Sequence, residues 1–361
     1  MFKTILATAL VILCARLSPG QEFASAFQAD TAVHIQAKLV EVYKIWTPKR
    51  HCMRTDLVRY RGHWFCCFQD SNGLIGEKQI SIIHSKDGRS WKSAAIIPRA
   101  GLPCSRFTAK SNDHLMLFSL AKSADPNVKS RSIGWSSQDG FEWTAFEPTV
   151  DGDSRISRMA WHKDRWFGVA SGYKTRRGIS SLVTSKDGKA FETCDADLPT
   201  GLYYEPSIVF SQNNTSYCLL SMLQTVEQIR PHGRIGYSAF PYQKWTWKKL
   251  GDWLVDPNLI ALPNHRFVVV GRKYDSRISL AFPKLSQITL WSLEPTTGRL
   301  AELLTLRSGD ELFSSGSPGL AWHDGHLWIS YNSSHELADS KTRTRIYLAK
   351  VKITEPSGKE N

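Results

Sequence analysis

Five charged residues recur at one place in a repeated sequence pattern. Arg54, Arg106 and Arg158 each open an apolar run, at intervals of 52 residues, and Glu205 and Asp256 open two later runs of the same kind. Guanidinium groups bind carboxylate or sulfate in a forked geometry that lysine cannot match. Paired carboxylates suit acid–base work on a glycosidic bond. One arginine alone would be interpreted as an exposed loop residue, but three at the same repeat position favour a pocket for an anion.

These residues belong to a unit of roughly fifty residues that occurs six times. Each unit holds an apolar run, a turn, a second aromatic-rich run and a third short run, and the units begin near Met53, Ser105, Ser157, Tyr204, Asp256 and Ser317. Short β-branched or aromatic runs between Gly, Asn and Asp turns are typical of antiparallel strands. The pattern predicts an all-β, six-bladed β-propeller. In such a ring the innermost strands begin around a central funnel, where the five charged residues and Ser317 would meet.

The repeat also predicts how the chain is divided. No linker or composition break interrupts it, so we expect one propeller domain over residues 30–354 and a polar tail over 355–361. The last unit lacks chain for an outer strand, and the segment VHIQAKLVEVYKIW, residues 33–46, is predicted to supply it. The ring would then be closed by an N-terminal strand.

A turn of the form Ser-x-Asp-Gly-x-x-aromatic occurs three times, starting at Ser85, Ser137 and Ser185. It joins the third predicted strand of a unit to the fourth. The aspartate can accept backbone N–H bonds, the glycine allows a positive φ, and the aromatic ring can pack between blades. We therefore expect a structural role for Asp87, Asp139 and Asp187, far from the axis.

This turn resembles the Asp-box, or BNR repeat, of the sialidase (neuraminidase) superfamily, whose members are six-bladed propellers that process or bind glycans. The family holds the substrate carboxylate with three arginines and uses a tyrosine nucleophile, an assisting glutamate and an aspartate as acid/base. By this resemblance Arg54 matches the first arginine, although Thr55 and Asp56 replace the usual Ile-Pro. Glu205 matches the assisting glutamate, and Arg272 or Arg277 the third arginine.

Other family positions differ in this chain. The second arginine would fall near Ser221 and Met222, where none is present. The acid/base position offers Asp70 or Glu77, and the tyrosine position holds Ser317. A serine hydroxyl without a histidine base is a poor nucleophile. The neighbouring tyrosines, Tyr204 and Tyr331, are the alternatives.

The beginning of the chain has a basic residue, an apolar run from Ile5 to Ala15 and then small residues. The run is too short to span a bilayer and is typical of a secretory signal peptide, over residues 1–20, with lipid attachment at Cys14 as an alternative. We expect a secreted or periplasmic protein without a membrane span. The other six cysteines form no CxxC pair and no histidine cluster accompanies them, so we expect mostly buried free thiols and no metal or cofactor.

A formal net charge of +13 indicates an anionic partner. Without a nucleic-acid-reading motif in an exported chain, an acidic glycan or glycoconjugate fits better than nucleic acid, and a monomer is expected. Two hypotheses follow. In the first, the chain is an exo-α-sialidase-like glycoside hydrolase with Glu205 and Asp256 as its carboxylate pair. In the second, it is a non-catalytic glycan- or protein-binding propeller that has lost the tyrosine nucleophile.

Overall fold

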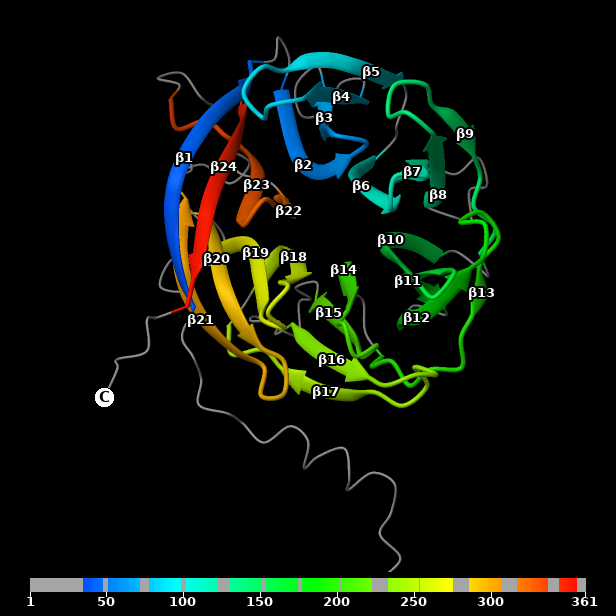
Figure 1. The fold of residues 1–361 in the computed structure, drawn as a ribbon. Helices are drawn as coiled ribbons and strands as arrows, with labels where there is room; N and C mark the ends of the chain where they lie inside the picture. Colours follow the sequence, from blue (N-terminus) through cyan, green and yellow to red (C-terminus); the bar gives the residue numbers. More distant parts are fainter. Residues whose placement is uncertain are drawn as a thin grey trace, which may run out of the picture.

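A computed structural model describes residues 35–47, 51–71, 78–98, 102–122, 130–150, 154–174, 177–200, 203–222, 233–252, 254–274, 286–306, 317–336 and 344–355. Its strands form six separate four-stranded antiparallel sheets arranged as a ring (Figure 1). The prediction of an all-β, six-bladed propeller is confirmed. The proposed signal peptide, the lipid-attachment alternative at Cys14 and the tail after Glu355 lie outside the described residues.

The first three blades follow each other along the chain. Blade 1 contains β2 (His51–Tyr60), β3 (His63–Ser71), β4 (Lys78–Ser85) and β5 (Lys92–Pro98). Blade 2 contains β6 (Leu102–Lys110), β7 (His114–Lys122), β8 (Ser130–Ser137) and β9 (Thr144–Phe146). Blade 3 contains β10 (Ser154–His162), β11 (Arg165–Lys174), β12 (Arg177–Ser185) and β13 (Glu192–Thr193).

The next two blades repeat this order and the last one changes it. Blade 4 contains β14 (Tyr203–Phe210), β15 (Ser216–Met222), β16 (Arg234–Ser238) and β17 (Thr246–Lys249). Blade 5 contains β18 (Leu254–Ala261), β19 (Phe267–Tyr274), β20 (Ser286–Glu294) and β21 (Arg299–Leu306). Blade 6 contains β22 (Gly319–His323), β23 (His326–Ser333), β24 (Arg345–Thr354) and, as its outermost strand, β1 (Gln36–Trp46).

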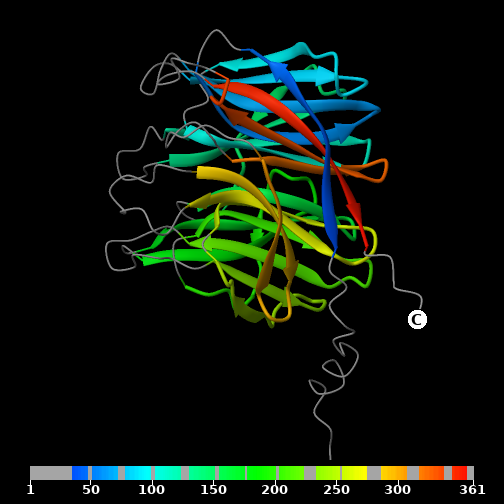
Figure 2. The same cartoon turned by 90° about the vertical axis from the view of Figure 1, so that its left-hand side faces the viewer.

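The pairing of β1 with β24 closes the ring, as the sequence predicts. The two strands run antiparallel from Gln36 opposite Thr354 to Trp46 opposite Ile346. In Figures 1 and 2 the blue β1 lies along the red β24 at the outside of the blade. The first and last segments of the domain therefore share one sheet, which couples the two ends of the chain.

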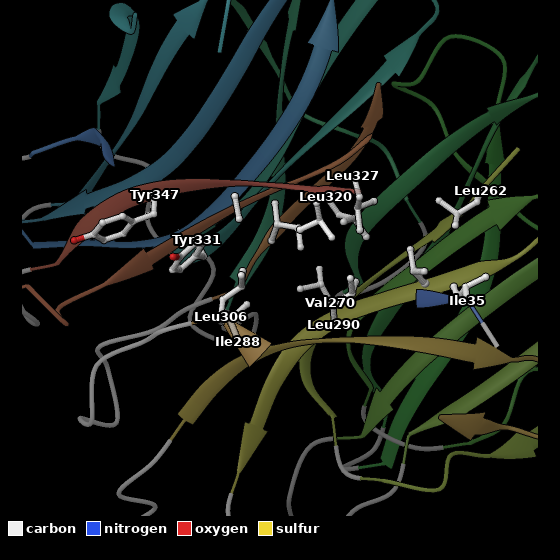
Figure 3. Packing of buried hydrophobic residues seen from close by; sticks show 14 residues of the cluster. Ile35, Leu262, Val270, Ile288, Leu290, Leu306, Leu320, Leu327, Tyr331 and Tyr347 are labelled. Carbon is white, nitrogen blue, oxygen red and sulfur yellow. The ribbon is translucent and has the colours of Figure 1, made fainter. Parts of the chain in front are cut away.

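Six hydrophobic clusters hold the blades together, one between each pair of neighbours. Figure 3 shows the cluster between blades 5 and 6, where Leu320 and Leu327 face Val270 and Leu290. Alternate residues of a strand point to opposite faces, so each strand can supply one side chain to each of two clusters. The free cysteines take part in this core: Cys52, Cys66, Cys67 and Cys218 are buried and Cys194 is half-buried, which confirms the prediction for these five.

The three Asp-box turns connect the third and fourth strands of blades 1 to 3. In the turn after β8, Oδ1 of Asp139 accepts hydrogen bonds from the N–H groups of Phe141 and Glu142, at 2.8 and 2.9 Å. Gly140 has a φ of 86° and lies against the ring of Phe65 in blade 1, so a Cβ there would collide with it. Because successive strands alternate in direction, these turns lie at the end of the blades opposite to the starts of the innermost strands. Their predicted structural role agrees with this geometry.

Blade 4 contains a related turn that lacks the motif. The indole N–H of Trp245 donates to the carbonyl of Tyr242 at 2.8 Å, as that of Trp91 does to Gly88 at 2.9 Å. Tyr242 has a φ of 67°, the conformation that glycine takes in the Asp-boxes. The same tryptophan contact thus forms without an Asp-Gly pair. Because that pair defines the Asp-box motif, the sequence shows no fourth copy of the motif.

Candidate functional site

A β-bulge or a larger register irregularity interrupts the innermost strand pair of each of the first five blades, near the start of the strand. The register shifts lie between Met53 and Thr55, Leu102 and Arg106, Ile156 and Met159, Tyr204 and Ser207, and Val255 and Asn258. A bulge adds a residue to one strand and redirects its side chain. The five predicted charged residues fall within or at the edge of these shifts, so one device repeats around the ring near the starts of the innermost strands.

Three of these residues have a strained backbone. Arg54, Glu205 and Asp256 have φ values of 57°, 48° and 51°. This left-handed region is unfavourable for a residue with a Cβ and persists only where the surroundings enforce it, often at functional sites. Equivalent strain in three different blades indicates that the position of these side chains matters more than local backbone stability.

The carboxylate of Glu205 lies between two arginines. Its Oε1 is 3.4 Å from Nη1 of Arg54, and its Oε2 pairs with Nη2 of Arg106. The side chains of Glu205 and Arg106 are each 5% exposed, whereas that of Arg54 is 22% exposed. Arg106 also donates to the carbonyl of Thr55 at 3.2 Å. Arg106 therefore holds Glu205 from within the protein, whereas Arg54 has the more exposed side chain of the two.

The second carboxylate, Asp256, pairs with an arginine of its own blade. Nη2 of Arg272, in β19, lies 2.6 Å from Oδ2 of Asp256. Burial disfavours the charged form of Asp256, but the positive charges of Arg272, Arg54 and Arg106 outweigh it and hold the pKa of this carboxyl below its usual value. Asp256 is therefore ionised at neutral pH. Arg272, predicted as one of two alternatives for the third arginine, lies in the cluster, whereas Arg277 lies outside the described residues.

Arg158 was expected to bind an anionic ligand, but in the structure it pairs with a carboxylate of the protein itself. Its Nη2 lies 2.9 Å from Oδ1 of Asp56, a residue with no exposed surface in the innermost strand of blade 1. The other oxygen of Asp56 accepts from the N–H of Phe107 at 2.8 Å. Asp56 thus links blades 1, 2 and 3, and it is a functional neighbour that the sequence reasoning noted only as a departure from the family pattern.

Blade 6 supplies a polar wall next to Arg54 and Glu205. The hydroxyl of Ser317 lies 3.4 Å from Oε1 of Glu205, and Oδ1 of Asn332 accepts from the N–H of Arg54 at 3.1 Å. The N–H of Thr55 donates to the carbonyl of Ser317 at 2.9 Å. Ser317 is buried where the tyrosine nucleophile was expected. The sequence distinguishes Asn332 only as the start of an Asn-x-Ser glycosylation sequon, so its contact with Arg54 was missed.

Tyr331 does not face the funnel. It is 1% exposed, belongs to the cluster between blades 5 and 6, and stacks on Tyr347 with ring centroids 5.4 Å apart (Figure 3). Burial raises the pKa of its hydroxyl well above the usual value. Its neighbour Asn332 contacts Arg54, and adjacent residues of a strand point to opposite faces. The proposal of Tyr331 as a nearby nucleophile therefore fails on strand alternation.

Of the remaining predicted site residues, the structure describes the side chain of Asp70 but not those of Tyr204 and Glu77. Asp70, near the end of β3, accepts hydrogen bonds from Ser81 at 3.2 Å and Gln79 at 3.3 Å. These partners belong to the same blade, so Asp70 is held by blade 1 rather than by the charged cluster. Tyr204 lies in β14 beside Glu205, but its side chain is outside the described residues, as is Glu77.

The described cluster has an excess of positive charge. Four guanidinium groups, those of Arg54, Arg106, Arg158 and Arg272, face three carboxylates, those of Asp56, Glu205 and Asp256. Guanidinium–carboxylate pairs hold each other in fixed geometry and leave one net positive charge at the funnel. Such an arrangement can attract and orient an anion.

Comparison with known proteins bears on the fold of the chain. No family model matches the chain, and no curated protein matches it either. Solved structures do match. A sialidase from Trypanosoma rangeli bound to the inhibitor DANA has a TM-score of 0.58 at 11% identity, over 87% of this chain and 59% of that one. This chain has the sialidase-like propeller fold.

Two further solved structures are similar to this chain over nearly their own whole length. A protein of unknown function from Dyadobacter fermentans has a TM-score of 0.68 at 15% identity, over 88% of this chain and 100% of that one. An α-L-arabinofuranosidase from Fusarium graminearum, with an iminosugar inhibitor, has a TM-score of 0.58 at 10% identity, over 86% and 98%. The sialidase-like propeller spans only about six-tenths of the Trypanosoma enzyme. At these identities the likeness concerns the fold.

Proposed function

We propose that this sialidase-like propeller binds an acidic glycan in its funnel, with the acid group of one sugar beside Arg54. The observation that carries the proposal is the arginine–carboxylate cluster built on three strained inner-strand residues, Arg54, Glu205 and Asp256. Strain of this kind costs stability and is retained where a side chain must be positioned. A ligand carboxylate or sulfate would complete the charge balance of the cluster.

The roles of the arginines differ in this proposal. Arg54 has the most exposed side chain of the four, at 22%, so it contacts the ligand. Arg106 and Arg158 are engaged by Glu205 and Asp56 and position the cluster. Arg272 is 13% exposed and keeps Asp256 in place in blade 5. The clamp of three equal arginines expected from the repeat is therefore replaced by one contacting arginine and three supporting ones.

Isothermal titration of the purified protein with sialyllactose, a glucuronide, a sulfated disaccharide and neutral lactose tests the proposal. We expect one acidic sugar to bind, and Arg54→Ala to weaken it at least tenfold, because a charge-assisted hydrogen bond contributes about 1.5–3 kcal/mol. Arg54→Lys should recover only part of the affinity, since lysine lacks the fork. Arg59→Ala is the matched control, because Arg59 lies in the same strand but donates to the carbonyl of Lys86. Equal affinity of Arg54→Ala and the native chain would contradict the proposal.

A second candidate function is glycoside hydrolysis. It is favoured by the contact between Ser317 and Glu205, which places a hydroxyl against a carboxylate where a nucleophile and its assistant would stand. The pKa of Asp256 argues against this candidate, because a lowered pKa leaves little protonated acid to donate to a leaving group. Fluorogenic sialosides and glucuronides separate the two functions. Turnover that disappears in Glu205→Gln would establish hydrolysis, and binding without turnover would establish recognition.

A further inference from the structure

A pocket lies on the face of the propeller opposite to the charged cluster. It has a volume of about 220 Å³ and is formed by the turns that end the innermost strands of blades 4 and 5, with one residue of blade 6. Its walls include Phe210, Gln212, Leu262, Pro263, His265 and Trp322. Glu205 and Phe210 are five residues apart in β14, which puts their Cα atoms roughly 17 Å apart at the usual rise per strand residue.

The chemistry of this pocket differs from that of the funnel. Among the described residues that line it, none is Lys, Arg, Asp or Glu. Two aromatic rings, Phe210 and Trp322, provide flat apolar surface, while the amide of Gln212 and the imidazole of His265 provide exposed hydrogen-bonding groups. Small-molecule sites typically combine apolar and aromatic walls with a few polar groups that fix orientation. Because these lining residues include no acidic side chain and no lysine or arginine, the pocket favours a neutral ligand.

The aromatic wall is held in place before any ligand arrives. The ring of Phe210 stacks on the imidazole of His162, with centroids 4.1 Å apart and planes 3° from parallel. The rings of Phe167 and Tyr242 meet it edge-on, at 5.3 and 5.4 Å. Trp322 is half-buried and packs against the cluster between blades 5 and 6. Fixed rings lose little conformational entropy on binding.

The polar wall is also fixed by contacts between the turns. Nε2 of Gln212 donates to the carbonyl of Pro263 at 3.4 Å, which links blade 4 to blade 5. His265 has a left-handed backbone, with a φ of 60°, and its N–H donates to the carbonyl of Leu262 at 3.1 Å. The same conformation occurs in the corresponding hairpin turn of other blades, at Arg61, Asn214 and Asp324, so the turn itself fixes the backbone of His265.

We propose that this opposite-face pocket binds one neutral sugar ring. The apolar C–H face of a pyranose or furanose can lie on an aromatic side chain, while its hydroxyl groups exchange hydrogen bonds with Gln212, His265 and Ser211. The volume is below the roughly 300–1,000 Å³ of drug-sized sites, so it suits one ring and not an extended chain. The propeller would thus hold a neutral sugar on one face and an acidic sugar on the other.

Saturation-transfer NMR followed by titration with xylotriose, cellotriose, mannotriose, maltotriose and lactose tests this site. We expect at least one of these sugars to bind at millimolar concentration, and both Trp322→Ala and Gln212→Ala to weaken it at least fivefold. Phe240→Ala is the control, because Phe240 is an aromatic residue 67% exposed and does not line the pocket. Arg54→Ala should leave the neutral sugar unaffected, so failure of the funnel proposal and failure of this one give different results.

Several outcomes would overturn the inference. They are binding of none of the five sugars, an unchanged affinity in Gln212→Ala and Trp322→Ala, or an equal loss in Phe240→Ala. If Trp322→Ala does not fold, Gln212→Ala decides the matter, because Gln212 is exposed in a surface turn. Binding of indole at the pocket without binding of any sugar would show an apolar site and would also contradict the proposal.

Discussion

The hydroxyl of Ser317 lies 3.4 Å from the carboxylate of Glu205, although the two residues are 112 positions apart in the chain. Ser317 lies two residues before the innermost strand of blade 6 and Glu205 lies in that of blade 4, so the contact joins two blades that are not neighbours in the ring. Both side chains are buried, and Glu205 also pairs with Arg54 and Arg106. Glu205 is therefore the residue through which blades 1, 2, 4 and 6 are electrostatically joined.

Replacing Glu205 by Gln should lower the free energy of unfolding by about 3 kcal/mol, because it leaves the buried guanidinium of Arg106 without its carboxylate. Binding of the acidic sugar should be retained, since the change removes a negative charge near the ligand. Urea denaturation and titration measure the two effects. The expectation is wrong if the variant is as stable as the native chain, which would mean that other groups neutralise Arg106.

The buried pair of Arg158 and Asp56 should be one of the main structural links of the funnel. Arg158→Ala leaves the carboxyl group of Asp56, which has no exposed surface, without its guanidinium partner, so we expect a loss of about 3–5 kcal/mol in unfolding free energy. Arg165→Ala is the matched control in the same blade, because Arg165 pairs with the exposed Glu192 and should contribute less than about 1 kcal/mol. Equal losses in the two variants, measured by urea denaturation, would contradict a special role for the buried pair.

The Asp-box aspartates should stabilise the fold in a pH-dependent way. Partial burial of Asp139 raises its pKa, but hydrogen bonds from Glu142, Phe141 and Ser137 outweigh this and hold the pKa below its usual value. Its stabilising contribution is therefore complete above the unfolded pKa of about 4 and is lost as the pH falls through the lower folded value. Asp139→Ala should lower stability by about 1 kcal/mol at pH 7.

Melting experiments on the native chain and Asp139→Ala between pH 7 and strongly acidic pH test this dependence. The difference between the two proteins should shrink as the solution becomes more acidic than about pH 4. Acidic-sugar affinity should be unchanged, because the turn lies at the opposite end of the blade from Arg54. A constant difference at all pH values, or a loss of sugar binding, would show that Asp139 has another role.

The N-terminal strand should be essential to the whole ring. Removal of the chain up to Trp46 deletes β1 and exposes the edge of β24, so we expect a large drop in melting temperature and a tendency to associate. Removal up to His34 leaves β1 intact and serves as the control. If both truncated proteins melt at the same temperature, ring closure through β1 contributes nothing to stability.

The sequence by itself determined the architecture. Six repeats of the same strand pattern can bury their apolar faces only against each other, and the missing outer strand of the last repeat can come only from the N-terminal segment. Local turn chemistry was equally readable, because Ser85, Asp87 and Gly88 act on residues of their own turn. Repeat position also identified Arg54, Glu205 and Asp256 as residues near the axis.

Only the tertiary structure decided the partners of these charges. Arg158 pairs with Asp56 and Arg106 with Glu205 between blades, while Arg272 pairs with Asp256 within blade 5. No local pattern specifies these choices. The bulges that give Arg54 a left-handed backbone have no sequence signature of their own here. The face of the sheet on which the side chain of Tyr331 lies depended on strand register, since a shift of one residue would put Asn332 on that face instead. The physical reason is the same in each case: repeats fix where strands lie, whereas long-range packing and electrostatics fix which side chains meet.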